Sequence, residues 1–117
     1  MNFALQEQIF SCMLEISSMY EITSRVDAVI RKLFPPKDQA TVRQILLEEC
    51  SDKLPLVKNP NEIERIQLGI LKLSLGDVST FLEAAHMARR DWRDVLVAAG
   101  FGNDLEAHSH WAAEVCK

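Results

Sequence analysis

The sequence is poor in the residues that shape sheets and tight turns. Its 117 residues include only four glycines and four prolines, and runs of β-branched side chains are scarce. Sheets need frequent turns and favour β-branched residues, so this composition favours an all-helical chain. A chain of this length can bury about two-thirds of its unfolded surface, and we expect residues 1–117 to fold as one helical domain.

A surplus of positive charge is also missing. The chain carries 13 basic and 17 acidic residues, for a net charge of −4. Nucleic-acid binders usually present a basic surplus on one face, and anionic membranes attract basic helices. The charge balance disfavours both kinds of partner. Glu7 and Glu15 interrupt the apolar N-terminal stretch, so we expect no membrane-spanning helix there.

Cysteine is rare and its spacing is uninformative. Cys12, Cys50 and Cys116 cannot all pair within one chain, and no C-x-x-C is present. The N-terminus lacks the basic region of a secretory leader. We therefore expect reduced, apolar thiols without disulfides, and a cytoplasmic protein.

Catalytic signatures are absent as well. The sequence has no G-x-S-x-G nucleophile turn and no glycine-rich phosphate loop. Cysteines on apolar helix faces are inert because burial raises the thiol pKa. We expect no catalytic residues and no cofactor.

The clearest pattern that is present lies between residues 78 and 99. Apolar residues recur there at intervals of three and four, namely at Val78, Phe81, Ala85, Ala88, Trp92, Val95 and Ala99. This spacing forms one stripe down an α-helix, and it predicts a single continuous helix about 33 Å long. Gly76-Asp77 and Gly100 supply the flanking stop and start signals.

A second helix precedes it. Asn59-Pro60 offers a capping residue followed by proline at the first helical position, and apolar residues then recur through Leu73. The two helices, at about 60–75 and 78–99, should form the central antiparallel hairpin of the bundle. Gly69 lies inside the first of them, where it either permits close approach of a neighbour or is a tolerated defect.

The N-terminal stretch Asn2–Met19 is apolar on more than one side. Its first helical stripe contains Ile9, Met13, Ile16 and Tyr20, and its second contains Phe3, Phe10 and Leu14. Such a helix is buried on more than one side. It is therefore either a central core helix or a surface that meets a second subunit.

The rest of the chain predicts further helices, for a total of five or six. One runs from Thr23-Ser24 to Pro35-Pro36, either separate from the N-terminal helix or continuous with it. Asp38 would cap the next helix, and Asn103 or Asp104 the last. The last helix should carry Leu105, His108, Ala112 and Val115 on one side. Acid–base pairs spaced four residues apart should lie on solvent-exposed helix faces. They are Glu21–Arg25, Asp27–Arg31 and, near the end of its helix, Glu49–Lys53.

A run of charges on the long helix is the candidate interaction site. It consists of Arg89, Arg90, Asp91, Trp92, Arg93 and Asp94. These residues form either a solvated face with local ion pairs, such as Arg90–Asp94, or a patch that fixes a partner's register. The opposite charges are too well balanced to favour polyanions.

A metal site has candidates but no complete ligand set. Glu83 and His86 form a Glu-x-x-His pair, which di-iron bundles use in duplicate. The only comparable pairs are Glu106–His110 and Asp104–His108, each spaced four apart. The alternative is that His86 flanks the core stripe and that the C-terminal histidines cap a helix or face solvent. We expect no metal, with Glu83, His86, Glu106 and His110 as the candidates if one binds.

Residues 63–101 carry a pattern of their own. The segment Leu71-Lys72-Leu73-Ser74-Leu75-Gly76-Asp77, followed by Ala88-Arg89-Arg90-Asp91-Trp92-Arg93-Asp94-Val95-Leu96, resembles a family of short uncharacterised bacterial helical proteins. Those proteins carry an LKL-x-x-GD turn and an A-[KR]-x-D-[WY]-R-D-[VL]-L helix. The resemblance implies that the hairpin and its charged face form a unit, and it implies no activity.

These observations predict a non-enzymatic cytosolic protein that acts through protein–protein interaction, as a homo-oligomer or with a protein partner. Two alternatives remain. One is a metal-binding bundle or small enzyme using Glu83 and His86 with C-terminal histidines. The other is a carrier of a small apolar ligand, which would need a closed cavity beside the hairpin.

Overall fold

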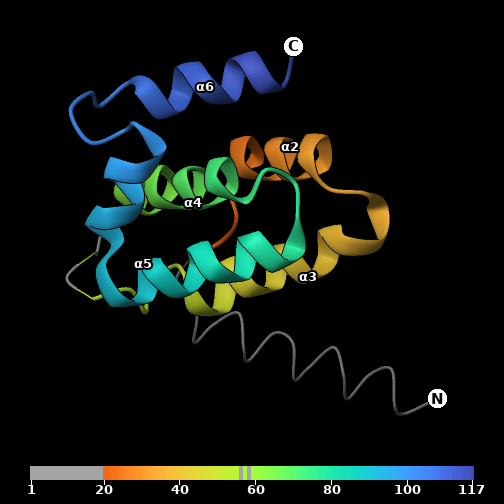
Figure 1. Ribbon diagram of the computed structural model, residues 1–117, viewed down its shortest axis with the longest axis horizontal. Helices are drawn as coiled ribbons and strands as arrows, with labels where there is room; N and C mark the ends of the chain where they lie inside the picture. The colour runs from red at the N-terminus through yellow and green to blue at the C-terminus, as the bar shows by residue number, and fades with distance from the viewer. Residues whose placement is uncertain (1–19, 56, 58) are drawn as a thin grey trace.

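The computed structural model describes residues 20–55, 57 and 59–117. The expectations for Asn2–Met19 and for Cys12 lie outside these residues. Within them the chain is helical and has no strand, and the predicted all-α bundle is confirmed (Figure 1). The helices are α2 (Ser24–Leu33), α3 (Pro36–Glu49), α4 (Pro60–Ser74), α5 (Val78–Ala99) and α6 (Ala107–Val115).

The predicted central hairpin is α4 and α5, which share the most extensive packing among the described helices. Asn59 caps α4, because its side chain accepts a hydrogen bond of 2.8 Å from the backbone N–H of Asn61. Asp77 caps α5 in the same way, because its side chain accepts a hydrogen bond of 2.9 Å from the backbone N–H of Thr80. Each cap satisfies a backbone donor that a helix start leaves open, which is why both helices begin where the sequence predicts.

The turn between the two helices depends on Gly76. Leu75 and Gly76 both have left-handed backbone angles, with φ of 55° and 77°. A Cβ atom on Gly76 would lie 2.6 Å from the carbonyl oxygen of Leu33, at the end of α2. Only glycine accepts both the backbone angle and this contact. The tip of the hairpin is therefore packed directly against α2.

Gly69 permits a close approach between α4 and α5. A Cβ atom at this position would lie 3.0 Å from Cγ1 of Val95 and 3.7 Å from Cβ of Ala99. The absent side chain thus leaves room for the neighbouring helix, and this decides between the two interpretations of Gly69.

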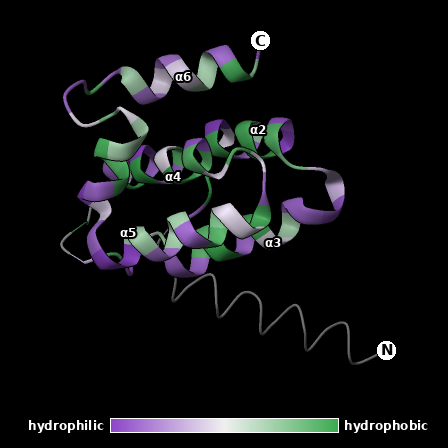
Figure 2. Cartoon of the chain, in the orientation of Figure 1, coloured by the Kyte–Doolittle hydropathy of each residue, from purple (hydrophilic) through white to green (hydrophobic). Residues whose placement is uncertain are grey.

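Helix α4 occupies the centre of the bundle. Helices α2, α5 and α6 pack against it, while α3 packs against α2 and α5 (Figure 1). Apolar residues concentrate on the inward faces (Figure 2). Large, fully buried side chains come from α2, α3, α4, α5 and the turn after α5, and they include Ile30, Leu46, Ile66, Phe81 and Phe101. No helix in the described ranges combines the length and apolar character that crossing a membrane requires.

Gln67 is a buried polar residue at the centre of this core. Its amide nitrogen donates to the carbonyl oxygens of Leu46, at 3.3 Å, and Cys50, at 3.0 Å, where α3 ends. Its amide oxygen accepts 3.4 Å from the hydroxyl of Tyr20. The side chain of Gln67 therefore joins α4 to the end of α3 and to Tyr20, in the segment before α2.

Two helix starts differ from the sequence predictions, and a third decides between two alternatives that the sequence leaves open. Helix α3 begins at Pro36, ahead of Asp38, because proline fits the first helical position, where its missing N–H costs nothing. Helix α2 begins at Ser24 with Thr23 as its cap, and residues 20–23 are not helical, so no continuous helix runs through them. Helix α6 begins only at Ala107, which leaves Leu105 in the preceding turn and 72% exposed. The prediction that Leu105 belongs to the last helix is wrong.

Replacing Gln67 tests whether its hydrogen bonds hold the layers together. We expect Gln67→Leu to lower the free energy of unfolding by about 2 kcal/mol, because it removes the donor to the end of α3 from a buried site. Urea denaturation measures this change. Gln44→Leu, on the exposed side of α3, is the control and should stay within about 0.5 kcal/mol of the parent protein. An equal effect of the two substitutions would contradict the role of Gln67.

Candidate interaction surfaces

Helix α5 is interrupted at Asp91. This residue has extended backbone angles, φ −157° and ψ 100°, between two helical halves. Its Oδ1 accepts a hydrogen bond of 3.1 Å from the backbone N–H of Arg93. Asp91 thus acts as the N-cap of the second half. The prediction of one continuous helix is wrong, because the apolar stripe continues across a point where the chain starts a new helix.

Most of the candidate interaction residues have partners within the chain. Arg89 forms an ion pair of 2.7 Å with Glu49 of α3. The Nε of Arg93 lies 3.1 Å from Oδ1 of Asp91, and this contact lowers the pKa of the Asp91 carboxyl. The indole N–H of Trp92 donates a hydrogen bond of 2.9 Å to the carbonyl oxygen of Pro55, and the Trp92 ring packs against the core.

Arg90 and Asp94 are the exposed remainder of this run. The predicted Arg90–Asp94 pair is not among the ion pairs between described residues, because the break at Asp91 disrupts the helical spacing between them. Nearby Val97 is 72% exposed. The outer face of α5 therefore exposes Arg90 and Asp94, the latter in electrostatic interaction with Arg93, beside the apolar side chain of Val97. This patch is smaller than the sequence predicts.

The two metal-candidate pairs lie on different sides of the bundle. Glu83 and His86 are exposed on the first half of α5, and Glu106 and His110 are exposed at the start of α6. Helix α4 lies between these segments (Figure 1). Among the described residues, no three His, Cys, Asp or Glu side chains gather where a metal ion could bind them.

His108 lies on the inner side of α6 and faces α4. Its Nδ1 is buried and has no hydrogen-bond partner among the described residues. Its ring meets Phe101 edge-on, with centroids 6.3 Å apart. Burial lowers the pKa of His108, since the charged form loses hydration. Arg25 and Arg65 act in the same direction, whereas Glu64 and Glu106 oppose the shift.

Arg65 occupies the same corner and is almost fully buried. Its guanidinium donates to Glu62, at 3.3 Å, and to the carbonyl oxygen of Phe101 just after α5. The ring of Phe101 in turn contacts Trp111 and lies under the ammonium of Lys72. This cluster anchors the turn that leads into α6. No sequence pattern indicates it, because its members come from three separate elements.

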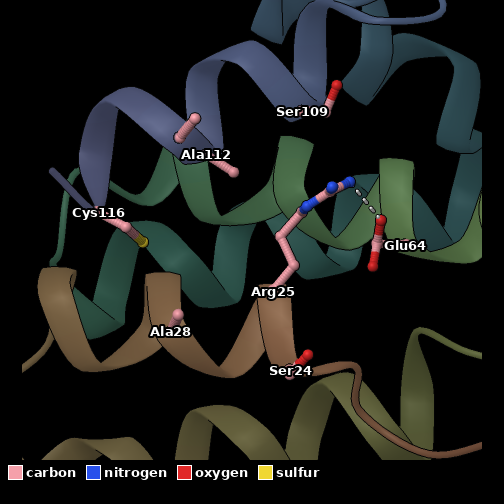
Figure 3. Close-up of a pocket in the computed structure, with 8 residues that line it drawn as sticks. Ser24, Arg25, Ala28, Glu64, Ser109, Ala112 and Cys116 are labelled. Atoms are coloured by element: carbon pink, nitrogen blue, oxygen red, sulfur yellow. Dashed lines mark hydrogen bonds and ion pairs between the residues drawn. The ribbon is translucent and has the colours of Figure 1, made fainter.

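A surface feature that the sequence does not predict is a groove between α2 and α6. One hollow of about 490 Å³ is lined by Ser24, Arg25, Ala28, Glu64, Ser109, Ala112, Ala113 and Cys116. Figure 3 shows these residues, with the Arg25–Glu64 ion pair of 3.1 Å joining α2 to α4. An adjoining hollow of about 550 Å³ continues along α2 past Asp27, Arg31 and Lys32. Both hollows are shallow and open to solvent.

Comparison with protein-family models, with curated proteins and with solved structures gives no match to this chain. The resemblance of residues 63–101 to short bacterial proteins therefore stays a prediction.

The contacts of Trp92 predict a stability effect. We expect Trp92→Ala to lower the free energy of unfolding by about 2–3 kcal/mol, because a half-buried ring leaves the core. Trp92→Phe should cost less, about 1 kcal/mol, because it keeps an aromatic ring on the core while it removes the hydrogen bond to Pro55. Val97→Ala on the same half-helix is the control and should change stability by less than about 0.5 kcal/mol. Urea denaturation measures all three. A neutral Trp92→Ala would show that the ring does not pack on the core.

His108 predicts a pH dependence of stability. Its pKa is lowered from the ordinary value near 6.5, so the unfolded chain binds a proton at this residue before the folded chain does. The contribution of His108 to the free energy of unfolding is therefore constant above the ordinary histidine pKa, and it decreases as the pH falls below that pKa. Urea denaturation at about 25 °C, repeated between pH 8 and pH 5, measures this fall in the free energy of unfolding. His108→Gln should make the fall smaller. His110→Gln, at an exposed site, should leave it unchanged, and the same reduction in both variants would contradict the assignment.

Proposed function

We propose that this protein acts without catalysis, by binding protein partners, and that it associates with itself through Asn2–Met19. The proposal is carried by the sequence of that segment, which places apolar stripes on more than one side of a helix. One stripe suffices to pack a helix onto its own domain. The other remains available for a second subunit.

The described part of the chain supports this division. Every helix from α2 to α6 contributes buried side chains to one apolar cluster that extends from Tyr20 to Ala112. The hydrogen bond from Tyr20 to Gln67 fixes the residue at which the N-terminal segment joins this cluster. A domain with its own core needs little further apolar surface. The sequence of the N-terminal segment provides two apolar stripes, which is more apolar surface than a contact with one face of the domain would bury.

The cellular setting is part of the proposal. Cys50 and Cys116 are free thiols, which suits a reducing compartment such as the cytoplasm. The resemblance of residues 63–101 supports a bacterial origin.

Native mass spectrometry over a tenfold dilution tests the proposal. We expect the parent protein to be a dimer without bound metal at both concentrations. Ile9→Asp with Phe10→Asp, which charges one residue in each stripe, should give monomers. Gln8→Asp with Ser11→Asp, on the polar side of the same segment, is the matched control and should remain dimeric. Circular dichroism on each variant verifies that the described helices persist.

Two results would contradict the proposal. A parent protein that is monomeric at both concentrations would remove the self-association. A monomer that carries bound metal, lost on Glu83→Ala or His86→Ala, would favour the metal-binding alternative instead.

A further inference from the structure

We propose that the groove between α2 and α6 receives the segment Asn2–Met19 of a second copy of this chain, so that two copies exchange their N-terminal segments. This inference rests on the proposed self-association and names the surface that each segment binds.

The shape of the groove fits a helix with large apolar side chains. The two hollows share Ser24, Ala28 and Cys116, and therefore form one continuous channel along α2. Its walls carry mainly short side chains, with Ala112 and Ala113 on the α6 side. Short side chains on both walls let a third helix approach closely. Residues such as Phe10 and Leu14 would then fill the space that the alanines leave.

Charge complements the shape. Arg31, which pairs with Asp27 at 3.0 Å, and Lys32 are exposed where the groove continues along α2, so basic residues outnumber acidic ones in this part of the lining. Asn2–Met19 contains Glu7 and Glu15 and no lysine, arginine or histidine. Exposed ion pairs contribute less than about 1 kcal/mol each. Their effect here is to select an acidic segment and to set its direction, while the apolar contacts supply the affinity.

The path of the chain favours a second copy over the chain's own segment. Tyr20 is buried and bonded to Gln67, whose amide also reaches the end of α3. The chain consequently runs from the start of α2 to the side away from α6 (Figure 1). Entry into its own groove would require the chain to reverse its direction before Tyr20. A reciprocal exchange needs no reversal, and it closes as a symmetric dimer with two equivalent grooves.

The native cysteines provide a direct test. Cys116 lines both hollows and so lies near the middle of the groove, and Cys12 lies near the middle of Asn2–Met19. A segment bound in either direction brings these two thiols near each other. Cys50 does not interfere, because it is fully buried and burial raises its pKa to about 12.

We would treat the parent protein with a flexible bismaleimide of about 15 Å, longer than the about 10–12 Å diameter of a helix, and map the linked peptides by mass spectrometry. The expected product is a covalent dimer joined between Cys12 and Cys116. Cys12→Ser and Cys116→Ser should each abolish this link. A Cys12–Cys116 link within one chain, or a dimer joined only through identical cysteines, would overturn the exchange.

A groove-filling substitution provides a second test that does not depend on thiol chemistry. Ala113 is exposed and lines the groove, whereas Ala98 is exposed on α5 outside it. Ala113→Trp should raise the dimer dissociation constant by about tenfold or more, and Ala98→Trp should leave it unchanged. A dimer unaffected by Ala113→Trp would overturn the groove while preserving self-association. A monomeric parent protein would instead overturn the proposed function on which both rest.

Discussion

The burial of α4 on all sides is the constraint on which the rest of this bundle depends. An unbroken run from Arg65 to Leu71 is buried, which is more than one apolar face of a helix can account for. Such a helix is stable only when neighbours enclose it, and here α2, α5 and α6 do so. The two polar residues in the run are also the ones that connect neighbours, since a buried polar group must find partners. Gln67 bonds to the end of α3, and Arg65 bonds to the turn after α5.

The sequence predicts the hairpin well because its determinants are local. Asn59 and Asp77 cap their own helices, and Gly76 permits the turn between them. The break at Asp91 escapes prediction for the opposite reason. Hydrophobic periodicity reports which side of a helix is buried, and that side is the same before and after the break. The only local signal is an aspartate two residues before Arg93, and isolated aspartates occur in many uninterrupted helices.

Ion pairs illustrate the same limit. Asp27–Arg31 forms within α2 as its spacing predicts, with the two groups 3.0 Å apart. Arg25 instead reaches Glu64 of α4. Glu49 pairs with Arg89 of α5 and not with the predicted Lys53. Helix spacing names the candidates within one helix, whereas a partner from another helix is set by packing. The groove is invisible to sequence for this reason as well, since its walls come from residues as distant as Ser24 and Cys116.

The contact between Gly76 and Leu33 has a consequence for how this surface could evolve. Any side chain at Gly76 would push against the carbonyl at the end of α2, and α2 is one wall of the groove. The tip of the hairpin therefore touches the helix that forms one wall of the channel, although the tip itself does not line the channel. Selection against any side chain at Gly76 would thus also preserve the position of this wall, although Gly76 contributes nothing to the channel lining.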